Sequence, residues 1–167
     1  MEKVIVIGCP GAGKSTFAKQ LQPLLDLPLY HLDQLNWLPD KTTVSKEQFV
    51  TRLDTILRQA CWLIDGNYGA TIERRLRECD TIFWLDYDEA TCLQGISERI
   101  GMARSDMPWV ETEVDPELVA FVKNYSRVSR PQLLALQATY STKNWIVFKT
   151  RQESAAYLQY YQQVKGE

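Results

Sequence analysis

The feature that most constrains this chain is the stretch VIVIGCPGAGKST at residues 4–16. Its first four residues are apolar and β-branched, which is typical of a strand buried on both faces of a parallel sheet. The next eight residues, Gly8 to Ser15, match G-x-x-x-x-G-K-[ST] at every fixed position. Because glycines let backbone N–H groups converge on one point, this pattern predicts a phosphate-binding loop at the start of a helix.

The residue types in this loop predict a nucleotide and a metal ion. An ordinary strand–turn–helix joint does not require a lysine and a serine directly after its last glycine. We expect Lys14 to reach the β- and γ-phosphates of ATP and the Ser15 hydroxyl to bind Mg²⁺. The residues expected to hold the nucleotide are Gly8, Pro10, Gly11, Ala12, Gly13, Lys14, Ser15 and Thr16.

Along the rest of the chain, short apolar runs alternate with segments of helical periodicity. Strands are predicted at residues 4–7, 28–32, 61–64, 81–85 and 145–148. Helices are predicted at 14–25, from about 45 to 60, at 72–76, 90–100 and 153–164, and from 115 to about 140 with a break near 129–131. Residues 33–43 and 101–114 are predicted as loops. Strands separated by helices indicate a parallel sheet covered on both faces.

Composition excludes several classes of protein. The 167 residues suffice for one domain spanning 1–167, and a net charge of −2 argues against a general nucleic-acid binder. Four scattered cysteines and a single histidine argue against a zinc site. No apolar run is long enough for a membrane helix, and the N-terminus lacks signal-peptide features. We therefore expect a cytoplasmic protein, a monomer or a homodimer, that does not bind membranes and is unlikely to bind nucleic acid directly.

Chemically useful residues follow four of the five predicted strands. They are Gly8, Asp33, Asp65 and Lys149. Ligands of open parallel sheets bind beyond the carboxyl ends of the strands, so these residues are expected to share one site. The chain has no N-K-x-D motif, which a switch GTPase of this size would usually carry.

Several motifs together carry a family resemblance that covers nearly the whole chain. The loop at 8–16 is followed in order by YHLDQLNW (30–37), WLIDGNY (62–68), CDTIFWLD (79–86) and SRP (129–131). In these motifs the chain resembles the adenylate-kinase-like P-loop proteins, and among them the group called DNA topology modulation proteins, or FlaR-like. The resemblance implies an α/β P-loop NTPase fold with a five-stranded parallel sheet of order 2-3-1-4-5, helices on both faces, an ATP site and a small lid around residues 99–115.

The resemblance also assigns roles to two aspartates. An acid at the end of the third strand orders magnesium waters in similar kinases, which points to Asp65. An acid after the second strand contacts the acceptor, which makes Asp33 the candidate for accepting its proton. The reverse assignment stays open at this stage. So do two structural readings, in which Asp33 caps a turn and Asp65 belongs to an Asp-Gly turn.

Residues on the expected acceptor side are aromatic or polar. Trp37 and Tyr68 could stack on a flat substrate, and Asn67 could bond to its polar edge. His31 could assist Asp33. For the two aromatic side chains anchoring of a loop is the alternative, and for His31 a structural hydrogen bond is equally compatible with the sequence.

Arginines are expected to neutralise the transferred phosphoryl group. The family pattern matches Arg99, Arg104 and Arg130 best, places Arg75 on the acceptor side, and puts Arg151 in the segment that contacts adenine. A solvated surface charge is the alternative for each. The chain departs from its relatives at Gln94-Gly95 and at Ala70, where they carry basic residues.

These features together predict a kinase that passes the γ-phosphate of Mg-ATP to a small acceptor. The missing arginine at Ala70 favours a neutral hydroxyl acceptor such as a nucleoside over a nucleotide. The alternative is a nucleotide-binding regulator of DNA topology or transcription without kinase turnover.

Overall fold

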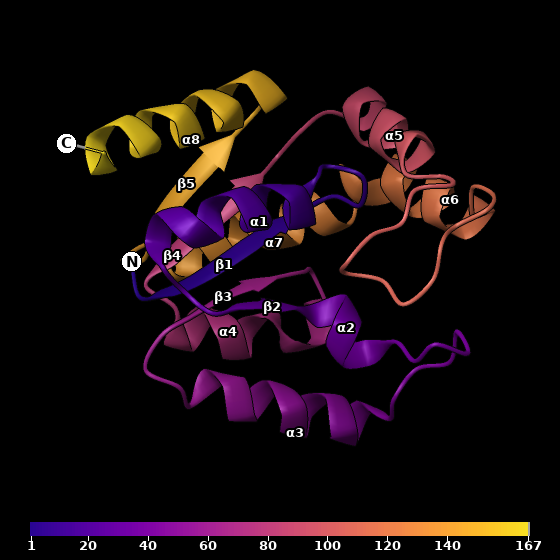
Figure 1. The fold of residues 1–167 in the computed structure, drawn as a ribbon, viewed down its shortest axis with the longest axis horizontal. Coiled ribbons are helices and arrows are strands. Elements are labelled where there is room, and N and C mark those ends of the chain that lie inside the picture. The colour runs from indigo at the N-terminus through magenta and orange to yellow at the C-terminus, as the bar shows by residue number, and fades with distance from the viewer. Residues whose placement is uncertain (167) are drawn as a thin grey trace.

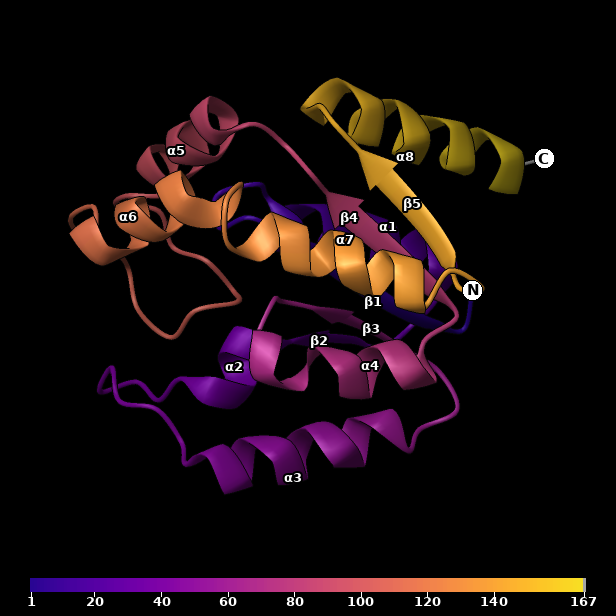
Figure 2. The ribbon, with the colours of Figure 1, turned by 180° about the vertical axis from the view of Figure 1, so that it is seen from behind.

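The computed structural model describes residues 1–166 as a five-stranded parallel sheet with helices on both sides (Figures 1 and 2). The strand order is β2-β3-β1-β4-β5, and each neighbouring pair is parallel. The strands are β1 (Lys3–Gly8), β2 (Leu29–His31), β3 (Trp62–Asp65), β4 (Thr81–Leu85) and β5 (Asn144–Phe148). Both the five predicted strands and their predicted order are confirmed.

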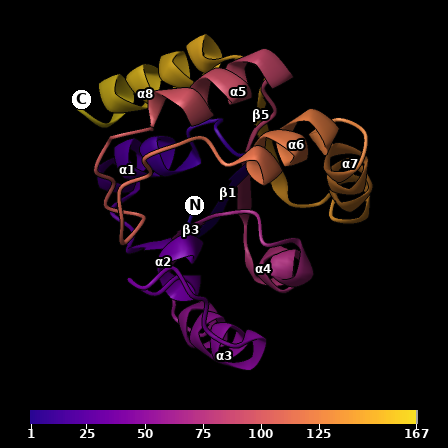
Figure 3. The same ribbon diagram turned by 90° about the vertical axis from the view of Figure 1, so that its right-hand side faces the viewer.

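The helices form two layers. In Figure 3 α1 and α8 cover one face of the sheet, and α4 and α7 lie on the other. The helices are α1 (Lys14–Leu25), α2 (Leu32–Asn36), α3 (Lys46–Leu57), α4 (Ile72–Glu78), α5 (Glu89–Glu98), α6 (Pro116–Tyr125), α7 (Ser129–Thr139) and α8 (Arg151–Lys165), with a 3₁₀ turn at Gly69–Thr71.

The centre of the core is the sheet itself. Residues 4–7 of β1 are fully buried, as a strand covered on both faces requires, and Trp62 and Trp84 of the neighbouring strands are enclosed with them. Removing this much apolar surface from water stabilises the sheet and fixes where its strands end. The loops that follow β1, β2 and β3 therefore start from a rigid base.

Side chains cap the starts of helices α3 and α6. Ser45 and Gln48 form a reciprocal capping box at α3, and the Asp115 side chain accepts from the backbone N–H of Glu117 at α6. The helix predicted at 115–140 is two helices, α6 and α7, which meet at residues 126–128. The break falls slightly before the predicted one at 129–131.

One helix was not predicted. Residues 33–43 were expected to form a loop, yet Leu32–Asn36 make the short helix α2. Five residues are too few for a periodic apolar pattern, so the sequence gives no signal for such a helix. The consequence is functional, because α2 places Asp33 in its first turn, directly beyond β2.

Between α5 and α6 the chain forms a long irregular segment, residues 99–115, called here the 99–115 loop. Its base is closed by a hydrogen bond from the Gly101 N–H to the Glu111 carbonyl, at 2.7 Å. Across residues 1–166, none of the helices is both long and apolar enough to cross a bilayer.

Candidate active site

The phosphate-binding loop turns tightly between β1 and α1. Gly11 and Gly13 have φ of 84° and 92°, in the left-handed region that favours glycine. A Cβ on Gly11 would also lie 2.0 Å from the Cys92 carbonyl oxygen of α5. Glycine is therefore required at Gly11 by both backbone conformation and the close approach of α5.

Lys14 lies at the base of a cavity of about 830 Å³. Its Nζ donates to the carbonyl oxygens of Gly8 at 3.0 Å and Cys9 at 3.2 Å. Burial lowers the pKa of Lys14, while the charges of Asp65 and Asp33 act in the opposite direction. The ammonium group of Lys14 therefore lies against the backbone at the start of the phosphate-binding loop, close enough to Asp33 and Asp65 to feel their charges.

Most of the predicted nucleotide-binding residues line this cavity. Residues 11–16 do so, whereas Gly8 and Pro10 stand behind it. Gly8 supports the loop instead, because a Cβ there would lie 2.6 Å from the Leu85 carbonyl oxygen of β4. Arg151 lines the same cavity at the start of α8 and pairs with Glu98 of α5 at 3.4 Å.

Asp33 faces the cavity from α2 and is held by Tyr68. The Tyr68 hydroxyl donates to Asp33 Oδ1 at 2.6 Å, and its ring stacks on Phe49 with centroids 5.0 Å apart. Burial, and then the Asp33 carboxylate, raise the pKa of Tyr68. Tyr68 therefore stays protonated and orients Asp33.

Asp65 is buried at the end of β3 and pairs with His31. The parallel register of β2 and β3 sets these two residues opposite each other, with His31 Nδ1 2.9 Å from Asp65 Oδ1. This contact matches the structural hydrogen bond considered for His31, and assistance to Asp33 stays a prediction. Among residues 1–166, the structure gives the second oxygen, Asp65 Oδ2, no hydrogen-bond partner.

Asn67 bonds to the phosphate-binding loop. Its side chain accepts from the Gly8 N–H at 3.0 Å and donates back to the Gly8 carbonyl oxygen. Both halves of the amide are therefore bonded to the phosphate-binding loop, and the substrate contact stays a prediction.

Arg75, expected on the acceptor side, bonds to backbone groups in this structure. The side chain is fully buried and donates to the carbonyl oxygens of Gly66, Asn67 and Tyr68. Burial lowers its pKa to about 10, so the guanidinium remains charged at neutral pH. Its donors hold the turn after β3 and face away from the acceptor side.

Trp37 follows α2 and packs on the 99–115 loop. Its ring meets Trp109 edge to face, with centroids 5.4 Å apart, and lies outside the lining of the large cavity. The structure shows loop anchoring, which was the alternative considered for Trp37, and shows no position of its ring in the cavity for stacking on a substrate.

Arg99 and Arg104 reach the large cavity from the 99–115 loop. Glu111 pairs with both, 3.1 Å from Arg99 and 3.6 Å from Arg104. Burial lowers the pKa of Arg99, and the nearby Glu111 charge opposes that effect.

Arg130 belongs elsewhere. It pairs with Asp86 at 3.0 Å, lies over the Trp84 ring, and lines a second cavity of about 470 Å³ that Lys149 also lines. In this structure Arg130 therefore lies apart from Arg99 and Arg104, and its predicted contact with the transferred phosphate stays a prediction. The buried carboxylate at the end of β4 holds it on the far side of the phosphate-binding loop.

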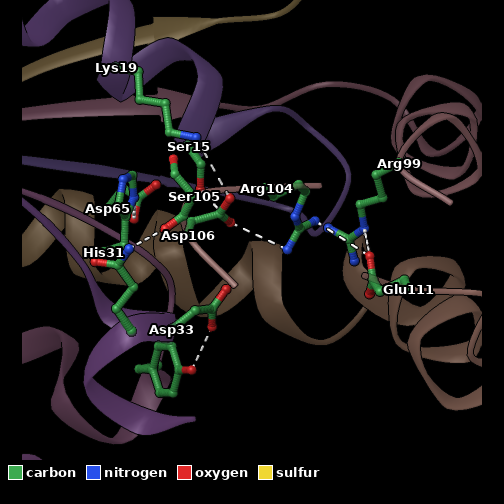
Figure 4. Close-up of polar contacts among 12 residues, drawn as sticks. Ser15, Lys19, His31, Asp33, Asp65, Arg99, Arg104, Ser105, Asp106 and Glu111 are labelled. Carbon is green, nitrogen blue, oxygen red and sulfur yellow. Dashed lines mark hydrogen bonds and ion pairs between the residues drawn. The ribbon is translucent and has the colours of Figure 1, made fainter. Parts of the chain in front are cut away.

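The sequence prediction missed Asp106 of the 99–115 loop. This side chain is only 4% exposed. The Ser15 hydroxyl donates to its Oδ2 at 3.2 Å, Lys19 Nζ lies 3.8 Å from Oδ1, and Arg104 lies 3.3 Å from Oδ2 (Figure 4). An aspartate in a polar irregular loop gives no spacing signal, so only the fold reveals its position.

The donors at this point fit Mg²⁺, a hard cation that prefers oxygen and keeps most of its water and phosphate ligands. Ser15, which lines the cavity, offers a hydroxyl, and the buried Asp65 offers a carboxylate oxygen that has no hydrogen-bond partner among residues 1–166. Residues 1–166 contain no group of three or more His, Cys, Asp or Glu side chains that could hold a metal. A Mg²⁺ brought by a nucleotide is compatible with such a sparse set of ligands.

Comparison with known proteins supports the fold. No family model matches the sequence, and no curated protein matches it significantly. Shikimate kinase from Acinetobacter baumannii, solved with shikimate, superimposes with a TM-score of 0.60 at 16% identity, covering 98% of this chain and 92% of that one. Shikimate kinase from Bacteroides thetaiotaomicron gives 0.56 at 18% identity, covering 98% of both chains.

A third similar structure is a sugar kinase from Janibacter, with a TM-score of 0.55 at 16% identity, covering 93% of this chain and 89% of that one. The chain therefore has the fold of P-loop kinases. At these identities the likeness shows the fold alone.

Proposed function

We propose that this protein transfers the γ-phosphate of Mg-ATP to a hydroxyl group of a small acceptor, with a nucleoside or nucleotide as the expected class. One observation carries the proposal: Lys14 and Asp33, from different elements, face the same cavity of about 830 Å³. A cation at a phosphate-binding loop and a carboxylate across from it are the two groups that phosphoryl transfer to a hydroxyl requires.

The surroundings of the two aspartates support distinct roles. Asp33 lines the cavity and is oriented by the Tyr68 hydroxyl, so it can accept the proton of an acceptor hydroxyl. Asp65 is buried against His31 and has one oxygen without a hydrogen-bond partner in the described part of the chain, residues 1–166, so it suits ordering of Mg²⁺ or its waters beside Ser15. When bound, Mg²⁺ would supply charge neutralisation at the phosphates.

The 99–115 loop supplies the remaining positive charge. Arg99 and Arg104 line the cavity opposite the phosphate-binding loop and can neutralise the transferred group. We propose that this loop acts as a lid within one domain spanning the chain. Arg151, which also lines the cavity, suits the base of the nucleotide.

The acceptor side favours a substrate without a phosphate. Arg75 and Asn67 are both occupied by backbone groups, which removes two candidates for binding an acceptor phosphate. A neutral hydroxyl acceptor is therefore favoured, a nucleoside before a nucleotide. The names of two similar structures, a shikimate kinase and a sugar kinase, fit a small polar acceptor.

Membership in the topology modulation group belongs to this proposal and is supported by the HLD and DGNY motifs. Asp33 of the first motif faces the cavity, and the hydroxyl of Tyr68 in the second motif donates a hydrogen bond to the Asp33 carboxylate. The alternative is a regulator that binds nucleotide without turnover. The assay described next distinguishes such a regulator from a kinase.

The test is ADP formation from Mg-ATP in the presence of nucleosides, nucleotides and small hydroxyl compounds. A true acceptor raises turnover well above the rate with ATP and water alone. Lys14→Ala should abolish this turnover because it removes the cation at the β- and γ-phosphates. Asp33→Asn should keep nucleotide binding but lower acceptor-dependent turnover by about 10²- to 10⁴-fold.

Circular dichroism and a thermal unfolding curve serve as controls for folding of both variants. Full activity in Lys14→Ala would contradict the assignment of the phosphate-binding loop. Absence of any acceptor effect, combined with tight, salt-resistant binding of duplex DNA, would favour the regulator instead.

A further inference from the structure

The carboxylate of Asp106 lies where the metal edge of a bound nucleotide is expected. It is carried by the 99–115 loop, far in sequence from the phosphate-binding loop, yet it is buried against Ser15. Figure 4 shows Asp106 beside Ser15, with Lys19 and Arg104 approaching it. Neither the motifs of the chain nor the transfer chemistry proposed above makes use of this residue.

The spacing of the two oxygens is that of neighbouring metal ligands. Ser15 Oγ and Asp106 Oδ2 are 3.2 Å apart. Mg²⁺ binds oxygen at about 2.1 Å in an octahedron, so two adjacent ligands are separated by about 3.0 Å. A single cation can therefore contact both oxygens with only a small adjustment of the loop.

The Asp106 carboxylate is paired with two cations that the phosphates of a bound nucleotide would attract. Arg104 and Lys19 lie 3.3 Å and 3.8 Å from the Asp106 carboxylate, and both line the cavity where phosphates are expected. Asp65, which is 3% exposed, has a carboxylate oxygen without a partner among residues 1–166. Buried carboxylates are stable when paired with cations or metal ions.

We propose that Asp106 is a ligand of the nucleotide-bound Mg²⁺ next to Ser15, so that the 99–115 loop docks on the metal–nucleotide complex and not on the nucleotide alone. This inference rests on the proposed function, because the metal arrives with ATP. Without the metal, the phosphates would meet the Asp106 carboxylate directly and be repelled. Metal therefore strengthens nucleotide binding through the loop as well as through Ser15.

Isothermal titration with the non-hydrolysable ATP analogue AMP-PNP measures this coupling without turnover. The readout is the ratio of the dissociation constant in EDTA to that in MgCl₂. In Asp106→Asn this ratio should fall about tenfold relative to the unchanged protein, since the variant lacks the anionic ligand. Asp106→Glu, which keeps a carboxylate, should recover part of the ratio. Such a recovery would also show that a substitution at this position does not prevent the site from folding.

Glu113→Gln is the matched control. It removes the same charge from an exposed position of the same loop and should leave the ratio unchanged. As a second readout, Mg–AMP-PNP should slow trypsin cleavage after Arg99 and Arg104 in the unchanged protein. Asp106→Asn should lose this protection.

Two results would overturn the inference. A ratio that is unchanged or larger in Asp106→Asn would exclude a metal ligand. If that variant also bound AMP-PNP more tightly in both buffers, Asp106 would be an anion that competes with the phosphates. Failure of the unchanged protein to bind AMP-PNP in either buffer would reject the proposed function itself, which keeps the two failures distinguishable.

Discussion

The guanidinium of Arg75 is enclosed beneath the turn that follows β3. Its donors satisfy the carbonyl oxygens of three successive residues, Gly66 to Tyr68. Burying a charge is expensive unless it is hydrogen-bonded, and unbonded carbonyls in the same place would be expensive as well. The arginine and the turn therefore stabilise each other.

Arg75→Met should lower the free energy of unfolding by about 3 kcal/mol, because it leaves buried carbonyls without donors. Urea denaturation measures this change. The neighbouring Arg74→Met is the matched control: Arg74 is half exposed and pairs with Asp54, so its loss should matter by less than about 1 kcal/mol. Equal effects of the two variants would contradict the structural role of Arg75.

At the residue scale, the sequence predicts best where a motif fixes both residue type and backbone. Lys14 and Ser15 lie where the glycine pattern puts them. Asn67 and Arg75 were read from residue type within a motif, and both side chains turned out to bond to backbone groups. A motif predicts which residue type is required at a position, but the direction of its side chain depends on the tertiary structure.

Helix α5 packs against the phosphate-binding loop without side chains between them. A Cβ on Gly95 would lie 1.9 Å from the Gly11 carbonyl oxygen, and one on Gly11 would lie 2.0 Å from that of Cys92. The departure from basic residues at Gln94-Gly95 therefore has a structural reason. Only glycine at Gly95 allows this approach of helix and loop.

Gly95→Ala reverses the usual effect of alanine in a helix. Alanine normally stabilises a helix interior by about 0.5–1 kcal/mol relative to glycine. Here the methyl group must push α5 away from Gly11, so we expect lower stability and about tenfold weaker binding of Mg–AMP-PNP. Urea denaturation and calorimetric titration measure the two effects.

Gln94→Ala, one position earlier on the exposed side of α5, is the control and should be neutral or slightly stabilising. If Gly95→Ala behaved in the same way, the close packing of helix and loop would not matter. Element-scale prediction from sequence has a similar limit. The alternation of strands and helices could be predicted from the sequence. Helix α2 and the backbone contact at Gly95 could not, because neither produces a periodic pattern of residues.

Asp86 connects three parts of the whole molecule. It directly follows β4, pairs with Arg130 of α7 at 3.0 Å, and contacts Lys149 in the segment between β5 and α8. Burial opposes ionisation of Asp86, but its hydrogen bonds to Arg130 and Lys149 outweigh that effect and hold its pKa below the usual value. The ionised carboxylate therefore favours the folded state.

Because the pKa of Asp86 is lower in the folded protein than in the unfolded chain, its contribution is complete above the unfolded pKa of about 4. It is lost as pH falls through the folded pKa. Asp86→Asn should lower the free energy of unfolding by about 1–3 kcal/mol at pH 7, where two partly exposed cations lose their partner. At pH 3 the difference should shrink.

Urea denaturation of both proteins at pH 7 and pH 3 tests this expectation, with Glu113→Gln as a charge control. A difference that stays constant between the two pH values would contradict the role of the ionised carboxylate. At this scale the family resemblance implied the sheet order, and the strand pattern predicted the common edge of Asp33 and Asp65. The position of Arg130 at the second cavity could not be predicted, because no sequence pattern shows which of two cavities a helix will face.

The amide of Asn67 ties the two sides of the site together. It bonds to both backbone groups of Gly8, while Arg75 holds the backbone of the same turn from beneath. The phosphate-binding loop and the turn after β3 are therefore held to each other by side-chain hydrogen bonds at two neighbouring strand ends. In the proposed kinase, these two joined turns would fix the distance between phosphate and acceptor before either substrate binds.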